Sequence, residues 1–200
     1  MRYALLASLA LTGLLATPSR GDLVVNGGFE TGSFDPLVDW TPQQPHDQYL
    51  FVAQSQVSGY GLSHSGNYFA ILAGFTVPFD TITQSIATQA GEQYSFSFWL
   101  RTNGDTSSHA DEFKASFGSQ LVLDDLSRAA SDWTQYSYVV TATSSSTTLK
   151  FSGAIGNTFW ALDDVSVTPS AVPEPASLLM LGTGVVALLG HARRRRRSAA

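Results

Sequence analysis

The sequence predicts an all-β domain, an antiparallel β-sandwich of the jelly-roll type, over residues 22–170. Large apolar and small polar residues alternate along several short segments, most clearly over residues 94–101, and a period of two is typical of a half-buried strand. Glycine and asparagine separate these segments at short intervals, as they do at turns. About seven to ten short strands in one domain favour a sandwich or jelly roll.

The charges are distributed unevenly along the 200 residues. The formal net charge is −5, but residues 22–170 hold fifteen of the sixteen acids and only four of the eleven bases, so this stretch carries −11. Phosphate binding needs clustered Lys and Arg, so an acidic domain argues against nucleic acid as a partner. The absence of cysteine excludes disulfides, thiol catalysis and cysteine-ligated metal sites.

Residues 1–21 have the pattern of a secretory signal peptide. Arg2 precedes the uncharged run 3–16, and the small residues Ser19 and Gly21 suit positions −3 and −1 of a signal peptidase site. A buried helix or a membrane anchor is the alternative, but a run of fourteen residues is short for a bilayer, which needs about twenty. We therefore expect export and a mature chain that starts at Asp22.

The strand patterns follow one another through the domain. In residues 113–123, Gly118 marks a turn or bulge, and residues 144–146 form a polar hairpin tip. Residues 124–130 are the one stretch that permits a helical turn. The other strand patterns lie at residues 82–86, 94–101, 136–140, 149–151 and 162–167.

The C-terminal residues 171–200 form a three-part segment. Pro173, Glu174 and Pro175 hold the backbone extended and stop any strand or helix that enters from the domain. The apolar stretch 176–192 follows and is expected to enter the membrane as a transmembrane helix. The final five bases stay on the cytoplasmic side as a membrane stop; they are Arg193, Arg194, Arg195, Arg196 and Arg197.

This segment resembles the PEP-CTERM sorting signal, in which a Pro-Glu-Pro motif, an apolar span and an arginine cluster occur in this order. The resemblance implies recognition of Pro173, Glu174 and Pro175 by exosortase, a membrane enzyme of Gram-negative bacteria that make extracellular polysaccharide. It also implies a transient inner-membrane anchor, followed by release to the cell surface, outer envelope or matrix. A plain C-terminal anchor with a proline-rich stalk is the alternative.

The two ends of the domain resemble those of galactose-binding-like jelly rolls, which include many carbohydrate-binding modules. The matching segments are residues 26–32, with Asn26-Gly27-Gly28-Phe29-Glu30, and residues 162–167, with Leu162-Asp163-Asp164-Val165. In those modules the first and last strands lie side by side and often share a structural calcium ion. The resemblance implies that Glu30 and Asp163 supply carboxylates, and that Gly28 and loop 65–68 supply backbone oxygens.

That ligand set suits the chemistry of calcium, which takes six to eight oxygens. Successive side chains of a strand point to opposite faces, so only one of Asp163 and Asp164 is expected to face the site. The alternative is that Glu30 and the aspartates are ordinary polar groups of turns and edges. If calcium binds at all, we expect it to act as a structural ion.

Trp99 is the best candidate platform for stacking on a sugar. Tyr94, Phe96, Phe98 and Leu100 share one face of their strand, which places Trp99 on the other face with small serines. The remaining aromatic candidates for sugar binding are Trp40, Tyr49, Trp133 and Trp160. A place in the core is the simpler explanation for them, and Trp40 and Trp133 match positions that are core in the resembling modules.

The sequence contains no catalytic motif. Residues 61–66 place serines beside His64 without forming Gly-x-Ser-x-Gly, and no zinc-protease, phosphate-loop or dinucleotide motif is present. His46, His64 and His109 lie in polar, loop-like surroundings and are expected to be solvated. We therefore expect a non-catalytic exported protein that binds or organises extracellular polysaccharide. A purely structural envelope protein without a glycan ligand is the alternative, and a glycosidase or esterase is a more distant one.

Overall fold

A computed structural model describes residues 21–32, 38–43, 50–56, 59–73, 79–103, 112–126, 130–154 and 159–170. The chain divides into two compact units, Met1–Pro169 and Ser170–Ala200. The described strands all belong to the first unit. They are β1 (Thr41–Pro42), β2 (Leu50–Gln54), β3 (Tyr68–Leu72), β4 (Asp80–Ala87), β5 (Gln93–Asn103), β6 (Glu112–Phe117), β7 (Gln120–Leu126), β8 (Ser131–Thr141), β9 (Ser146–Ala154) and β10 (Phe159–Pro169).

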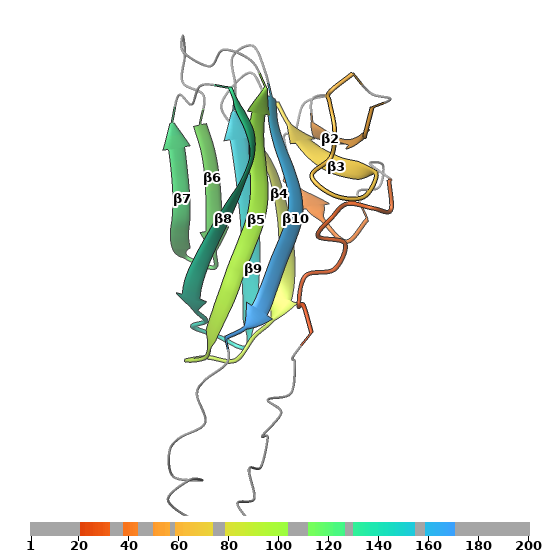
Figure 1. Ribbon diagram of the computed structural model, residues 1–200. Coiled ribbons are helices and arrows are strands. Elements are labelled where there is room, and N and C mark those ends of the chain that lie inside the picture. Colours follow the sequence, from red (N-terminus) through yellow and green to blue (C-terminus); the bar gives the residue numbers. More distant parts are fainter. Residues whose placement is uncertain are drawn as a thin grey trace, which may run out of the picture. The chain divides into compact units, whose positions relative to one another are not determined.

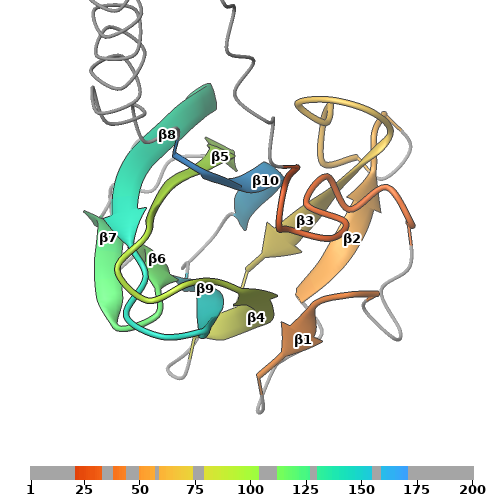
Figure 2. The same ribbon diagram turned by 90° about the horizontal axis from the view of Figure 1, so that it is seen from below.

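The strands form two antiparallel five-stranded sheets that face each other (Figures 1 and 2). One sheet has the order β1-β4-β9-β6-β7, and the other has the order β2-β3-β10-β5-β8. Most neighbours in each sheet are distant in the sequence, because most connections between consecutive strands cross from one sheet to the other. The expected all-β, antiparallel jelly-roll sandwich is confirmed.

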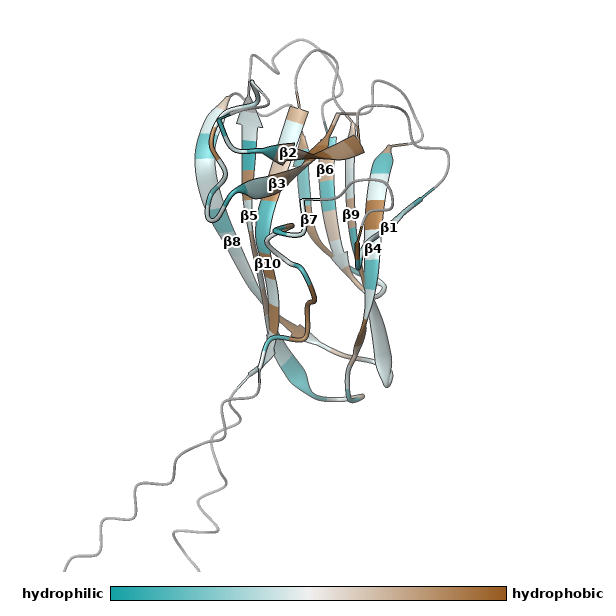
Figure 3. Ribbon diagram, turned by 90° about the vertical axis from the view of Figure 1, so that its right-hand side faces the viewer, coloured by the Kyte–Doolittle hydropathy of each residue, from teal (hydrophilic) through white to brown (hydrophobic). Residues whose placement is uncertain are grey.

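The core lies between the sheets and is rich in aromatic rings. Along β5, Tyr94, Phe96, Phe98 and Leu100 are all buried. The ring of Phe98 meets Phe151 of β9 edge-on, with centroids 5.2 Å apart. In Figure 3 the hydropathy changes from residue to residue along the strands, as it must when one face packs inward and the other meets water.

The β6–β7 hairpin confirms one expectation and corrects another. Gly118 lies in its turn with φ at 59°, a conformation that favours glycine. The helical turn expected at 124–130 is wrong for residues 124–126, which belong to β7 and pair with residues 112–114 of β6. Pairing with a neighbouring strand outweighs a weak local helix preference.

The two ends of the domain lie side by side, as the resemblance implied. The N–H of Leu23 donates to the carbonyl of Val167 at 2.9 Å, and the N–H of Val165 donates to the carbonyl of Gly27 at 3.0 Å. A Cβ on Gly27 would lie 2.0 Å from the oxygen of Val165, so only glycine permits this approach. The N-terminal segment thereby pairs with β10 beyond the residues that pair with β3.

The signal peptide expected at 1–21 and the span expected at 176–192 lie outside the described residues, apart from Gly21. Over the residues that the model does describe, no helix is long and apolar enough to cross a membrane.

Candidate functional site

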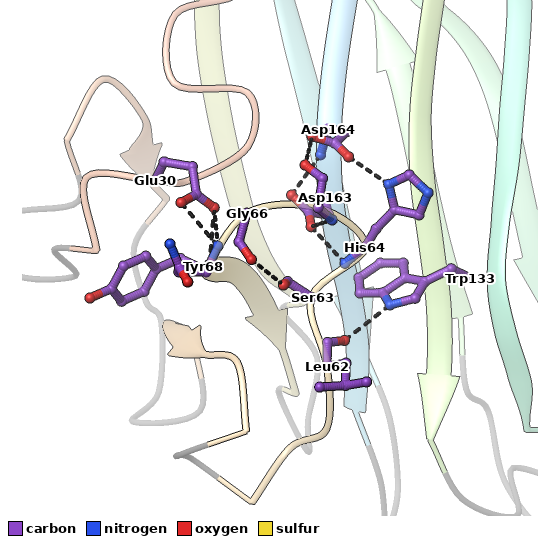
Figure 4. Close-up of polar contacts among 11 residues, drawn as sticks. Glu30, Leu62, Ser63, His64, Gly66, Tyr68, Trp133, Asp163 and Asp164 are labelled. Atoms are coloured by element: carbon purple, nitrogen blue, oxygen red, sulfur yellow. Dashed lines mark hydrogen bonds and ion pairs between the residues drawn. The ribbon is translucent and has the colours of Figure 1, made fainter.

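Carboxylates from both ends of the domain hold one loop in place (Figure 4). We call Glu30, Asp163 and Asp164 the carboxylate cluster, and residues 62–67, the last part of the connection from β2 to β3, the clamped loop. Glu30 accepts from the backbone N–H of Asn67 at 2.9 Å and of Tyr68 at 3.0 Å. Oδ2 of Asp163 accepts from the N–H of His64 at 2.9 Å and, farther along, from that of Ser65 at 3.2 Å.

A bulge in β10 brings both aspartates to the same loop. The register with β5 shifts between Asp163 and Ser166, and Asp164 has a φ of 46°. Asp164 accepts from the hydroxyl of Ser65 at 2.8 Å, and its other oxygen lies 2.5 Å from Nδ1 of His64. The expectation that only one aspartate serves this site is wrong, because the bulge interrupts the alternation of side chains.

Asp163 is a buried acid. None of its surface is exposed, and burial, reinforced by the negative charge of Asp164, raises its pKa to about 7. Backbone hydrogen bonds from Ser65, Asp164 and His64 act in the opposite direction. Burial and the neighbouring carboxylate therefore outweigh the three backbone hydrogen bonds.

The positions expected to bind calcium do lie together. A Cβ on Gly28 would lie 3.7 Å from Cγ of Glu30 and 3.8 Å from Oδ1 of Asp163. Carboxylate oxygens are the ligands that calcium prefers, but those of Glu30 and Asp163 already accept backbone N–H groups. In the part of the chain that is described, no three His, Asp or Glu side chains form a group that could hold a metal. Calcium would therefore need backbone oxygens, such as that of Gly28, beside the two carboxylates.

His64 lies flat on Trp99. Their ring centroids are 3.7 Å apart and the planes differ by 16°. Trp99 is on the outer face of its sheet, as expected, but it is half-buried rather than an open platform, because the imidazole covers one face of its indole. The expectation of a solvated His64 is also wrong, since its side chain is 27% exposed and paired with Asp164.

Trp133 and Arg101 hold the other end of the clamped loop. Nε1 of Trp133 donates to the carbonyl of Leu62 at 3.1 Å, and the guanidinium of Arg101 lies 5.0 Å from the centre of the same indole. Nη2 of Arg101 donates to the carbonyl of Tyr60 at 2.6 Å. Burial lowers the pKa of Arg101, and the charge of Asp132 opposes this effect. Sequence patterns did not point to Arg101, because its partners come from another strand and a distant loop.

The remaining residues singled out in the sequence lie in the core or outside the described residues. Trp40 and Trp160 are core residues, 2% and 0% exposed, which leaves them no surface for a ligand. Tyr49, His46 and His109 lie outside the described residues. So do Pro173, Glu174, Pro175 and Arg193–Arg197.

No hydroxyl beside His64 is arranged as a nucleophile. Ser65 donates to Asp164, and Ser63 donates to the carbonyl of Gly66 at 3.0 Å. Among the described residues, neither hydroxyl makes a hydrogen bond with the imidazole. The cluster therefore lacks the nucleophile–base pair of a serine hydrolase.

Comparison with protein families identifies the C-terminal segment. The model of the PEP-CTERM protein-sorting motif matches residues 171–197, which confirms the sorting signal expected from Pro173, Glu174 and Pro175. The motif indicates an exported, surface-directed protein. No curated protein matches the chain.

Solved structures share the fold of the domain. The module TmCBM61, solved with β-1,4-galactotriose, is 14% identical with a TM-score of 0.54, and the alignment covers 75% of this chain and 99% of that one. The CBM22-1 xylan-binding domain of Xyn10C from Paenibacillus barcinonensis is 16% identical with a TM-score of 0.51, covering 79% and 100%. The enzymatically active domain of tailspike protein 4 from bacteriophage CBA120 is 16% identical with a TM-score of 0.52, covering 74% and 21%. These likenesses show the jelly-roll fold of carbohydrate-binding modules.

Proposed function

We propose that this protein is a non-catalytic glycan-binding protein, which exosortase processes and which acts at the cell surface or in the extracellular matrix. The observation that carries the proposal is the stacked pair of Trp99 and His64 on the outer face of the β2-β3-β10-β5-β8 sheet. Aromatic rings beside polar groups are the usual means by which proteins bind apolar faces of small ligands. Two solved relatives in fold bind β-1,4-galactotriose and xylan, which supports a sugar as ligand.

The carboxylate cluster positions this aromatic pair. Asp163 and Asp164 bind the backbone and ring of His64, and Glu30 holds the far end of the clamped loop. Five hydrogen bonds between the carboxylate cluster and the clamped loop, with a sixth to the adjacent Tyr68, limit the motion of His64. A ligand would meet a pre-organised surface and would not need to order the loop on binding.

A structural calcium ion is part of the proposal. Glu30 and Asp163 both lie close to Gly28, and a divalent cation held by them and by the Gly28 carbonyl would neutralise the buried charge of Asp163. The ion would stabilise the junction between the two ends of the domain, and no contact between the ion and a glycan is proposed.

The geometry of the clamped loop supports the proposal of a non-catalytic role. Ser63 and Ser65 donate to the backbone and to Asp164, respectively, so neither hydroxyl is paired with the imidazole of His64. A panel of chromogenic glycosides and esters should remain unhydrolysed by the purified protein. Turnover that is lost in His64→Ala would instead favour the esterase alternative.

Affinity gels that contain a polysaccharide test glycan binding directly. Trp99→Ala should abolish retardation of the domain, because it removes the larger ring of the stacked pair. Leu121→Ala is the control, since it removes a side chain that is 51% exposed on β7 in the other sheet. Unchanged mobility of the wild-type protein in every polysaccharide would favour a purely structural envelope protein.

Processing at the C-terminus is tested by the mass of the exported protein. Cleavage by exosortase should remove Arg193–Arg197, so the mature mass should lack this segment. Replacement of Pro173, Glu174 and Pro175 by alanine should leave the segment attached. Exported wild-type protein that retains all five arginines would contradict processing.

A further inference from the structure

A row of hydroxyl groups continues from Trp99 along the outer face of the same sheet. Ser97 of β5 pairs with Ser137 of β8 on one side and with Ser166 of β10 on the other. Two residues farther along, Ser95 pairs with Thr168 of β10. Paired residues point to the same side of a sheet, so these hydroxyls share one surface. We call this surface the hydroxyl face; its residues are Ser95, Ser97, Ser137, Ser166 and Thr168.

The hydroxyl face has unused hydrogen-bonding capacity. Ser137 is exposed, and the other four side chains are partly exposed. Within the part of the chain that the structure describes, none of these hydroxyls bonds to another protein group, although the backbone around them is paired in the sheet. Each hydroxyl can donate one hydrogen bond and accept two. The face therefore offers hydroxyls at fixed positions, each of which can act as a donor or as an acceptor.

The charges of this sheet exclude one class of ligand. Arg101 is the only cation in its five strands, and its guanidinium is engaged with Tyr60 and Trp133. The same strands contain three acids, Asp132, Asp163 and Asp164. Lys114 and Lys150 belong to β6 and β9 of the other sheet. An anionic chain would therefore find no unengaged cation in these five strands, whose side chains carry more negative than positive charge.

The shape of the surface favours an extended ligand. Ser95 and Trp99 are four residues apart on one strand, a distance of about 13 Å at the usual rise. Figure 3 shows β8, β5 and β10 side by side along this length, with polar bands on all three strands. The pair of Trp99 and His64 lies at one end of the row, so stacking and hydrogen bonding follow each other along β5.

We propose that the hydroxyl face, together with Trp99 and His64, binds an internal stretch of an uncharged linear polysaccharide. This inference rests on the proposed glycan-binding function and specifies its ligand class. A neutral sugar chain supplies hydroxyls that both donate and accept, which matches the side chains of the face. Uronate-rich and sulfated chains are disfavoured, because the five strands offer them no unengaged cation.

The test compares variants that remove hydroxyls with a matched control. Ser97→Val and Ser137→Val, made together, delete two hydroxyls and keep residues that suit a strand. Thr148→Val is the control, because Thr148 is an exposed residue of β9 in the other sheet. Binding of the full domain to xylan, β-1,4-galactan and polygalacturonate is measured by affinity gels and calorimetry at low salt. Circular dichroism confirms that each variant is folded.

The wild-type protein should bind at least one of the two neutral chains and should not bind polygalacturonate. The double variant should bind the neutral chain about tenfold more weakly, since each lost hydrogen bond costs about 0.5–1.5 kcal/mol, whereas Thr148→Val should be unchanged. The corresponding monosaccharide should compete poorly with the chain.

The possible failures are distinct. Binding that Trp99→Ala removes but the double variant leaves intact would overturn the role of the hydroxyl face and leave glycan binding standing. Salt-sensitive binding of polygalacturonate would overturn the uncharged ligand class. A wild-type protein that binds none of the chains would count against the proposed function itself, and the inference would fall with it.

Discussion

The imidazole of His64 lies on the indole of Trp99, with ring centroids 3.7 Å apart and planes 16° apart. The contact joins the clamped loop to the centre of β5. Asp164 orients the imidazole, because its carboxylate binds Nδ1 of the same ring. It connects the carboxylate cluster to the surface that we propose for glycans. Several of the consequences can be measured without knowing the ligand.

Removal of the imidazole should loosen the clamped loop. We expect His64→Ala to reduce the free energy of unfolding by about 1–2 kcal/mol, because the ring contact and a hydrogen bond are both lost. His64→Phe should recover part of this loss, since a phenyl ring can stack but cannot bind Asp164. Urea unfolding measures both variants. Equal stability of His64→Ala and wild type would show that the stacking contributes nothing.

Without metal, the domain should be more stable at mildly acidic pH than at alkaline pH. The pKa of Asp163 is raised to about 7 in the folded protein from an ordinary value of 3.8, so folding favours the protonated acid. The free energy of unfolding should therefore fall by about 2–4 kcal/mol as pH rises from about 4 to about 7, and level off above that.

Urea unfolding in the presence of a chelator, at a series of pH values, checks this dependence. Asp163→Asn should flatten the profile, because the amide keeps the shape of the side chain and does not ionise. A stability that rises with pH over the same range would contradict the raised pKa.

Calcium should raise the melting temperature of the domain. At a concentration 100 times its dissociation constant, a ligand that binds only the folded state adds about 2.7 kcal/mol. Glu30→Gln and Asp163→Asn should remove most of the shift, whereas Asp132→Asn, an exposed acid of β8 outside the carboxylate cluster, should keep it. Identical melting curves in calcium and in chelator would rule out the structural ion.

The junction between the two ends of the domain should depend on Gly27. A Cβ at this position would lie 2.0 Å from the backbone oxygen of Val165, which cannot move without distorting β10. We expect Gly27→Ala to destabilise the domain by about 1–3 kcal/mol. At Gly28 a Cβ would make only ordinary contacts, the nearest with Oδ1 of Asp164 at 3.4 Å, so thermal unfolding of Gly28→Ala in chelator should stay close to that of the wild type.

The sequence by itself determined the elements whose signal is local. Alternation along residues 94–101 places Phe96 and Phe98 in the core and Trp99 on the other face, because the period of a strand is a property of its backbone. The sorting motif at 171–197 was equally readable, since its parts follow one another in the chain.

Only the tertiary structure decided which distant residues meet and how. Asp164 joins the carboxylate cluster through a bulge in β10, and His64 reaches Trp99 because Asp163, almost a hundred positions away, binds the backbone of its loop. Strand pairing also makes residues 124–126 part of β7, where the sequence predicted a helical turn. Contacts of this kind depend on register and on backbone hydrogen bonds between strands, and neither leaves a periodic trace in the sequence.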